Sequence, residues 1–186
     1  MIYDRRGKTV DINFWIVQGI GVVAWLVLLV SYYREDTDKI LIFQTIATAL
    51  YCVHYYLLGA YSGLFICVFE VIRDYLYYKT DLDHYIFVSS IPIYVANGFI
   101  TFTGWYDLLP ALASFIDGYG LTKKRNSVVL WAVITYTAWV IYDIFVMSYS
   151  CALTDGLVVL SNLSILLFDF NPFEFKKKGK QPINLR

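Results

Sequence analysis

Residues 12–33 read INFWIVQGIGVVAWLVLLVSYY, a continuous apolar run that contains no charged side chain. An α-helix rises 1.5 Å per residue, so about 20 such residues are enough to cross the hydrocarbon core of a bilayer. The run is too long for the apolar segment of a secretory signal peptide, and it follows the charged stretch MIYDRRGKTVD. We therefore expect this first run to stay in the membrane.

Six further apolar runs follow, and the seven together fill most of the 186 residues. Because the runs are continuous and do not alternate apolar with polar residues, they favour helices over barrel strands. The fifth run is the shortest and contains Pro110, and the fourth has Pro92 near its middle, where we expect a kink. The sequence thus predicts an all-α integral membrane protein with seven transmembrane helices at 12–33, 40–58, 61–78, 84–102, 106–121, 127–147 and 149–168.

The composition agrees with this fold class. Apolar residues make up 59% of the chain and charged residues 16%, whereas soluble domains average roughly 45–50% and about 25%. The formal net charge of zero argues against a nucleic-acid partner, whose recognition needs positive charge. Cys52, Cys67 and Cys151 are scattered through apolar runs, without a CxxC motif or a histidine at metal-ligand spacing. We expect packing roles for them, and no metal or cofactor.

The loop charges predict the orientation in the membrane. With seven spans, one side carries three cations, Arg5, Arg6 and Lys8, all before the first span. The other side carries most of the rest: Arg34, Lys39, Lys79, Lys123, Lys124, Arg125, Lys176, Lys177, Lys178, Lys180 and Arg186. The positive-inside rule therefore places the N-terminus outside and residues 169–186 in the cytoplasm as a basic tail.

The lengths of the loops suggest an internal duplication. Residues 12–78 and 106–168 each read as helix, charged loop, helix, tight turn and helix. A three-helix unit ends on the side opposite its start, so a second copy in the same orientation needs one extra crossing, which residues 84–102 supply as a linker helix. An offset of 87 residues aligns Tyr55 with Tyr142, but the layout carries more weight than such matches. We expect a parallel three-plus-one-plus-three repeat.

Two stretches near the middle of the chain resemble a known family. Residues 54–63 (HYYLLGAYSG), followed by EVIRD at 70–74, and residues 101–110 (TFTGWYDLLP) are similar to the core of the YgjV-type bacterial inner-membrane family. That family is grouped with the PnuC-type vitamin transporters and the SWEET sugar facilitators. The resemblance implies the three-plus-one-plus-three plan, the inner membrane as location, and, by analogy, a transport function.

Ionisable side chains at membrane depth are candidates for function because they are costly to bury. Glu70 falls near the middle of the third run, and Arg73 and Asp74 share its helix face at i+3 and i+4. We interpret Glu70 as a substrate contact and Arg73 and Asp74 as a gate, with Asp117 on the fifth run. The alternative is a neutral ion pair that only lets the helices pack. Proton coupling through Glu70 is a second, less favoured interpretation.

Two aspartates fall in the outer third of the last two runs. Asp155 lies on the helix that the duplication places opposite the third, so Asp155 and Glu70 are expected to line one cavity. The competing interpretation of Asp155 is that it caps the preceding tight turn. Asp143 is a candidate substrate ligand, but a solvated role at the membrane interface is favoured, because it lies four residues from the end of its run.

The remaining candidates are polar or aromatic residues on several runs. His54 has no second histidine at metal spacing, so a hydrogen bond between helices is favoured over a metal. Asn97 lies beyond Pro92, where a loosened helix could bind substrate or simply form an interhelical hydrogen bond. Tyr55 and Trp139 would wall a polar cavity that suits a flat or cationic metabolite. Two prolines, Pro92 and Pro110, complete the predicted gate.

The sequence discriminates among four classes of function: an enzyme, a retinal protein, a transporter and a membrane scaffold. The sequence has no HExxH motif, no GxSxG-type nucleophile on a span and no phosphate-binding loop, so we expect no enzyme activity. The last run, 149–168, lacks the lysine that a retinal protein needs. A transporter or facilitator of a small polar metabolite, resembling a vitamin, nucleoside or sugar, is the favoured function. The alternative function is that of a membrane scaffold that transports nothing. The expected partners are the lipid bilayer and the solute, and the sequence is also compatible with a homo-oligomer.

Overall fold

A computed structural model describes residues 2–3, 9–10, 14–32, 37–80, 82–122 and 125–168. These residues form a helical bundle, one short 3-10 helix and a small antiparallel hairpin in which Ile2 pairs with Val10. The elements are β1 (Ile2–Tyr3), β2 (Thr9–Val10), α1 (Phe14–Tyr32), α2 (Thr37–Leu58), α3 (Tyr61–Lys79), α4 (Asp83–Ile100), η1 (Trp105–Leu108), α5 (Leu109–Leu121), α6 (Arg125–Phe145) and α7 (Tyr149–Phe168).

The helical class and the seven long helices confirm the prediction, and α7 has the predicted bounds. The fifth run differs: it begins as η1, and α5 starts only at Leu109. Pro110 lies in the first turn of α5, where its missing N–H leaves no hydrogen bond unmade. Helix α4 continues through Pro92. Arg5, Arg6, Lys8 and the predicted tail 169–186 lie outside the described residues.

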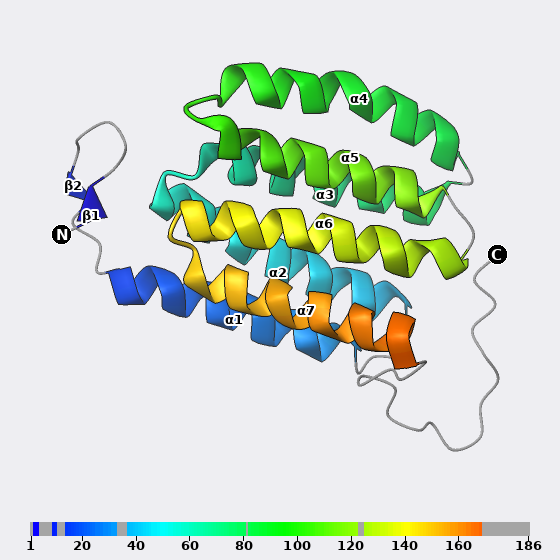
Figure 1. The fold of residues 1–186 in the computed structure, drawn as a ribbon, viewed down its shortest axis with the longest axis horizontal. Helices are drawn as coiled ribbons and strands as arrows, with labels where there is room; N and C mark the ends of the chain where they lie inside the picture. The colour runs from blue at the N-terminus through cyan, green and yellow to red at the C-terminus, as the bar shows by residue number, and fades with distance from the viewer. Residues whose placement is uncertain are drawn as a thin grey trace.

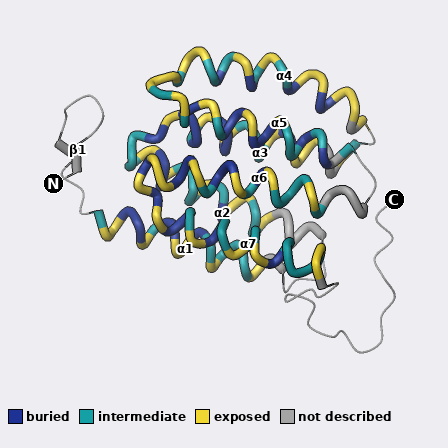
Figure 2. The backbone as a smooth tube through the Cα atoms, viewed as in Figure 1, coloured by how far each residue is buried: buried dark blue, intermediate teal, exposed yellow. Residues whose placement is uncertain are grey.

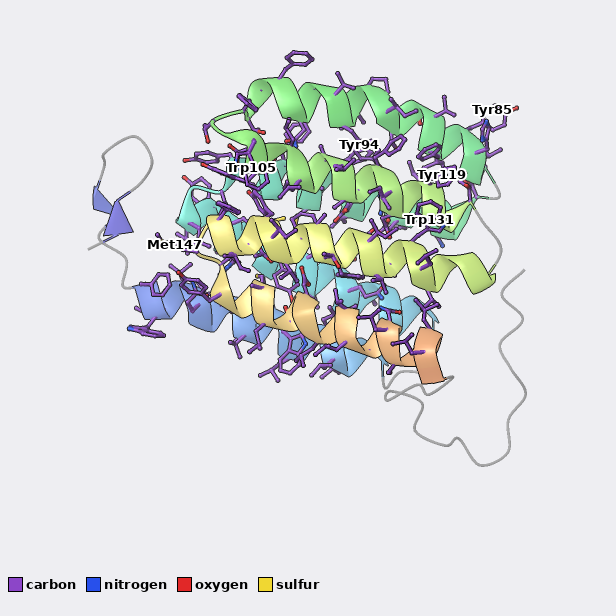
Figure 3. All side chains as sticks on the ribbon, in the orientation of Figure 1. Tyr85, Tyr94, Trp105, Tyr119, Trp131 and Met147 are labelled. Carbon is purple, nitrogen blue, oxygen red and sulfur yellow. The ribbon has the colours of Figure 1, made fainter. Side chains whose placement is uncertain are left out.

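The seven helices lie side by side along one direction, and each runs antiparallel to the one before it (Figure 1). Helix α2 packs between α1 and α3, and α6 packs between α5 and α7. Two further contacts, α1 with α7 and α3 with α5, join these groups. Helix α4 packs on α5 and α3 at the edge of the bundle. Trp105 and Met147 mark one end of the bundle, and Tyr85 marks the other (Figure 3).

Two turns at the same end of the bundle have the same geometry. Gly59 ends α2 with φ of 69°, and Met147 follows α6 with φ of 61°. In each turn the next N–H, from Ala60 or Ser148, bonds the carbonyl five residues earlier at 2.9 and 2.8 Å. This is a left-handed helix C-cap, a conformation that favours glycine. The helices that follow, α3 and α7, begin 88 residues apart.

Figure 2 shows buried and exposed residues along every helix of the bundle; many of the exposed residues are large and apolar, and many of the buried ones are polar. Large apolar side chains are widely exposed, among them Trp15, Phe99, Ile100 and Leu153. The largest fully buried side chains include polar and charged ones: Arg73, His54, Asn97 and Asp143. A soluble protein shows the reverse arrangement, so this distribution fits a helical bundle whose solvent is lipid.

Within the described residues, one segment, Tyr149–Leu167, is both long and apolar enough to cross a membrane by length and composition. Helix α3 is rich in charged residues, and α5 has 13 residues, which extend about 20 Å. Seven spans therefore stay a prediction. Shorter apolar segments are Phe14–Val30, Ile42–Leu58, His84–Ile100 and Val129–Phe145.

Candidate functional site

Polar and thiol side chains from four helices gather along the axis of the bundle. On three helices they come as pairs spaced three or four residues apart, which places each pair on one helix face. Tyr51, Tyr55, Cys67 and Cys151 pack in one core cluster, so these faces meet inside the bundle. We call this set the central file: Tyr51 and Tyr55 on α2, Cys67 and Glu70 on α3, Cys151 and Asp155 on α7, and Asp143 on α6.

One end of the central file, close to the turn between α6 and α7, is a buried tyrosine–aspartate pair. The Tyr55 hydroxyl donates a 2.9 Å hydrogen bond to Oδ1 of Asp143, and the Tyr55 ring stacks on Trp139 with 6.1 Å between ring centroids. Asp143 is 0% exposed, and its Oδ2 has no hydrogen-bond partner among the described residues. The solvated interfacial role that the sequence favoured for Asp143 is therefore wrong, because burial removes the carboxylate from water.

Asp155 and Glu70 occupy the middle of the central file. The Asp155 carboxylate interacts electrostatically with Glu70 on α3 and with Asp143 on α6. Asp155 lies six residues inside α7, too far along the helix to cap the turn before it, so the capping alternative is wrong. Glu70 accepts a hydrogen bond from the Ser114 hydroxyl on α5. The two predicted carboxylates thus lie together, and Ser114 is a contact that the sequence reasoning missed.

The opposite end of the site is built around Arg73, whose side chain is 2% exposed. Its guanidinium forms ion pairs with Asp117 on α5 at 2.6 Å and with its neighbour Asp74 at 2.9 Å. It also donates to the Ser114 carbonyl at 3.1 Å and to the Tyr94 hydroxyl at 3.3 Å. One side chain therefore ties α3 to α4 and α5. We call these residues the Arg73 hub.

Three of the predicted gating residues, Arg73, Asp74 and Asp117, thus come together in the hub. The two predicted prolines do not join it. Pro92 is exposed on α4, and Pro110 is buried at the start of α5, near the opposite end of that helix from Asp117. Pro110 serves the backbone geometry of a helix start. Among the described residues, it is not a member of the ion pairs of Arg73.

His54 forms two interhelical hydrogen bonds, as the sequence predicts. Its Nδ1 lies 2.8 Å from the Val17 carbonyl on α1, and its Nε2 lies 2.9 Å from the Ser148 hydroxyl. A carbonyl can only accept, so Nδ1 carries the proton, and Nε2 of the neutral ring accepts from Ser148. Both nitrogens are used, and no group of three or more metal-ligating side chains occurs in the described part of the chain.

Gln18 is a functional candidate that the sequence reasoning missed. Its amide nitrogen donates to the Met147 carbonyl at 2.8 Å, and its amide oxygen accepts from the Ser150 N–H at 2.9 Å. Together with His54 it fastens α1 and α2 to the turn between α6 and α7. The cost of burying an amide among apolar residues, the argument that selected Asn97, would have found Gln18 as well.

Asn97 links α4 to α3 near the same end of the bundle. Its side-chain nitrogen donates to the Ser62 hydroxyl at 3.0 Å, and Ser62 in turn donates to the Asp107 carbonyl. The Asp107 carboxylate accepts from the backbone N–H groups of Thr103 and Gly104 at 2.9 and 3.1 Å. Asn97 therefore forms an interhelical hydrogen bond, which was the alternative to substrate binding. These contacts do not include the carboxylates of the central file.

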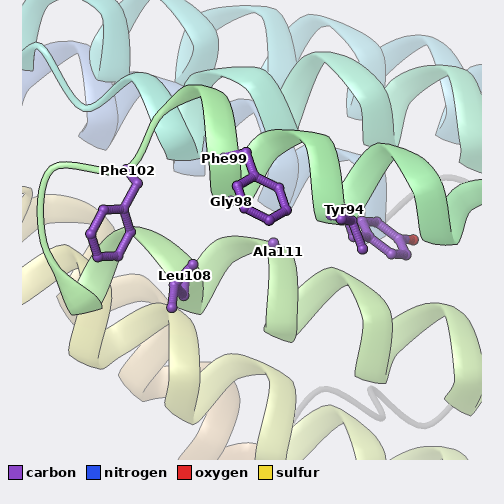
Figure 4. A pocket seen from close by; sticks show the side chains of 7 residues that line it. Tyr94, Gly98, Phe99, Phe102, Leu108 and Ala111 are labelled. Atoms are coloured by element: carbon purple, nitrogen blue, oxygen red, sulfur yellow. The ribbon is translucent and has the colours of Figure 1, made fainter.

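Two grooves on the surface of the bundle contain no carboxylate. A cavity of about 580 Å³ lies between α4 and α5, and Figure 4 shows Tyr94, Phe99, Phe102 and Leu108 around it. A second, of about 380 Å³, lies between α6 and α7 beside Gly156 and is also lined mainly by apolar side chains. Both open toward the apolar surface, whereas Asp143 is fully buried and Glu70 and Asp155 are partly buried.

The comparisons with known proteins fit this picture. The profile of the Imp-YgjV family, described as "Bacterial inner membrane protein", matches residues 15–168. The chain is also 24% identical over 181 residues to the inner membrane protein YgjV of Escherichia coli (strain K12), and the match covers 92% of each chain. No solved structure matches the chain.

Proposed function

The chain belongs to the Imp-YgjV family of bacterial inner membrane proteins, and from that premise we propose that it carries a small polar metabolite across this membrane. Residues 12–78 and 106–168 would move as two three-helix bundles around the central file, joined by the linker helix 84–102. The solute would be a vitamin-like, nucleoside-like or sugar-like molecule.

The observation that carries the proposal is the meeting of Glu70 and Asp155 inside an apolar-coated bundle. Counting 1.5 Å per residue from the end where α3 and α7 begin places Glu70 at a depth of about 14 Å and Asp155 at about 9 Å. Carboxylates at such depth are costly and are typical of solute or ion pathways. They come from helices on different sides of the linker, as a site between two moving bundles requires.

Three features support a repeat of two three-helix bundles. If α1, α2 and α3 correspond to α5, α6 and α7, the contact of α1 with α7 becomes the contact of α5 with α3, and both occur. The turns that contain Gly59 and Met147 have the same hydrogen bonds and the same left-handed backbone. They give an offset of 88 residues, one more than the 87 expected from the sequence.

The contacts at the two ends of the central file would act as gates. At the end where α1 begins, Gln18, His54 and Tyr55 bond the first bundle to α6, α7 and the turn between them. At the other end the Arg73 hub bonds α3 to α5. Alternating access would break one set of contacts while the other set holds. The loop charges favour an outside N-terminus, a cytoplasmic C-terminus and the hub on the cytoplasmic side.

The chemistry of the central file favours a solute that donates hydrogen bonds or carries positive charge. Its polar atoms are three carboxylates and two tyrosine hydroxyls, and the Trp139 ring lies beside Tyr55. Carboxylates accept hydrogen bonds from amines, amides and hydroxyls, and aromatic faces stack on flat rings or cations. An anionic solute would be repelled.

A thermal-shift screen of the purified full-length protein against vitamins, nucleosides and sugars tests the proposal. A ligand that binds only the folded state at 100 times its Kd stabilises it by roughly 2.7 kcal/mol. The stabilising compound should then enter liposomes that contain the protein faster than empty liposomes. A protein that no compound stabilises, and that admits none into liposomes, would be a scaffold and would refute the proposal.

A further inference from the structure

The central file contains three carboxyl groups and no lysine or arginine side chain. Among the described ion pairs, Arg73 pairs with Asp74 and Asp117, whereas Glu70, Asp143 and Asp155 take part in none. The Arg73 guanidinium interacts electrostatically with Glu70 but already has two carboxylates as direct partners. Within the described residues, Glu70, Asp143 and Asp155 are therefore left without an ion-pair partner.

The surroundings of Asp143 and Asp155 contain no compensating positive charge in the described part of the chain. Asp143 is faced by the Tyr55 hydroxyl from α2 and by Cys151 and Asp155 from α7. Asp155 is faced by Tyr51 from α2, by Glu70 from α3 and by Asp143 from α6. Glu70 is faced by Cys52 from α2, by Ser114 and Asp117 from α5, and by Arg73 and Asp74 on its own helix.

A second observation singles out one atom in this group. Among the described residues, Oδ2 of Asp143 is buried without a hydrogen-bond partner, while Oδ1 of the same carboxyl accepts from Tyr55. A buried carboxylate oxygen without a partner is strongly unfavourable, whereas a carboxyl O–H at that position removes the charge. A metal ion does not fit, because no cluster of three or more ligating side chains occurs in the described residues.

We propose that Asp143, Asp155 and Glu70 form a proton-binding site along the axis of the bundle, with at least one proton held by the Asp143–Asp155 pair. Binding forms an O–H bond on one of these carboxylate oxygens, and release breaks that bond and leaves the carboxylate. Coupling between this proton and a solute rests on the proposed function. Binding of the proton by these carboxylates does not depend on transport.

Infrared difference spectroscopy tests the site without any solute. The full-length protein in lipid bilayers should show, at neutral pH, the C=O stretch of a protonated carboxyl, and this band should shift in D2O. Asp143→Asn and Asp155→Asn should each remove part of the band, and each should shift what remains, because the two groups interact. Glu70→Gln should remove a separate component.

Asp107→Asn is the matched control, because Asp107 is buried too, but its carboxylate accepts hydrogen bonds from the backbone N–H groups of Thr103 and Gly104, outside the central file. It should leave the band unchanged. Labelling all aspartates with carbon-13 in the unmutated protein gives a second measurement that needs no variant: the Asp143–Asp155 component shifts and the Glu70 component does not.

A spectrum without a protonated carboxyl band at neutral pH would overturn the proposal, as would a band that survives in the Asp143→Asn, Asp155→Asn, Glu70→Gln triple variant. Neither result would bear on transport, which the uptake of a stabilising compound tests separately. A band that is present and assigned to these residues supports the proton site even if no solute is ever found.

Discussion

Replacing Gly63 by alanine should destabilise the protein strongly, because Gly63 on α3 lies directly against Tyr142 on α6. A Cβ at this position would lie 2.8 Å from a ring carbon of Tyr142 and 3.0 Å from its hydroxyl oxygen. Tyr142 is 0% exposed, so its ring has no free space to move into. The Gly63 N–H also donates a 2.9 Å hydrogen bond to the Tyr142 hydroxyl, which the added methyl group would displace.

The expected magnitude follows from these two contacts. Overpacking a filled interior costs about 1–3 kcal/mol, and the loss of one buried hydrogen bond costs about 1 kcal/mol. For a chain of this size each kcal/mol lowers the Tm by roughly 2–4 °C, so Gly63→Ala should lower it by roughly 5–15 °C. Tyr142 precedes Asp143, so the same shift should disturb the bond between Asp143 and Tyr55.

The assay is thermal unfolding of the purified protein in detergent, followed by intrinsic tryptophan fluorescence. Gly19→Ala is the matched control, because a Cβ at Gly19 meets nothing within 4 Å. Both variants exchange a helical glycine for alanine, so any gain in helix propensity is common to them. A Gly63→Ala protein as stable as the Gly19→Ala protein would refute the packing of α3 against α6.

Two further predictions use the same assay. Arg73→Gln should cost about 3 kcal/mol, because it removes every contact by which the buried guanidinium ties α3 to α4 and α5. Asp117→Asn should cost about 1–2 kcal/mol, because Asp117 is partly exposed and Arg73 keeps Asp74. Equal losses in the two variants would contradict the role of Arg73 as the hub. Met147→Gly should stabilise the protein by about 1 kcal/mol, because it relieves a left-handed residue whose side chain is 55% exposed; a lower Tm for this variant would contradict the turn geometry.

Much of the fold could be predicted from the sequence because membrane helices are long apolar runs with polar ends. The prediction for residues 149–168 matches α7, and the other long helices end within a few residues of their predicted bounds. The fifth run differed because apolar character alone does not say where a helix starts. Pro110 fixes that start, and the residues before it fold as η1, held by the Asp107 carboxylate.

The site could be predicted only as far as helix spacing reaches. The i, i+3 and i+4 rule placed Glu70, Arg73 and Asp74 on one face, and burial cost selected Asp155. The bond from Arg73 to Asp117 spans 44 residues, so it depends on how α3 packs against α5. No local pattern encodes that packing, and for the same reason Ser114 was missed, whereas the cost of burial would have selected Gln18.

Three native thiols offer the most direct test of a site that opens to water. Cys52, Cys67 and Cys151 are free and lie beside the carboxylates of the central file. Cys67 and Cys151 are only 7% and 2% exposed, so a rigid bundle would protect them.

The measurement is the rate at which a charged, membrane-impermeant thiol reagent labels Cys67 and Cys151 in the native protein in liposomes. Two moving bundles predict slow but complete labelling, slowed further by any compound that the thermal-shift screen finds to bind. Cysteines that stay unlabelled in the native protein, yet react fully after denaturation, would show that the interior never opens and would contradict transport through it.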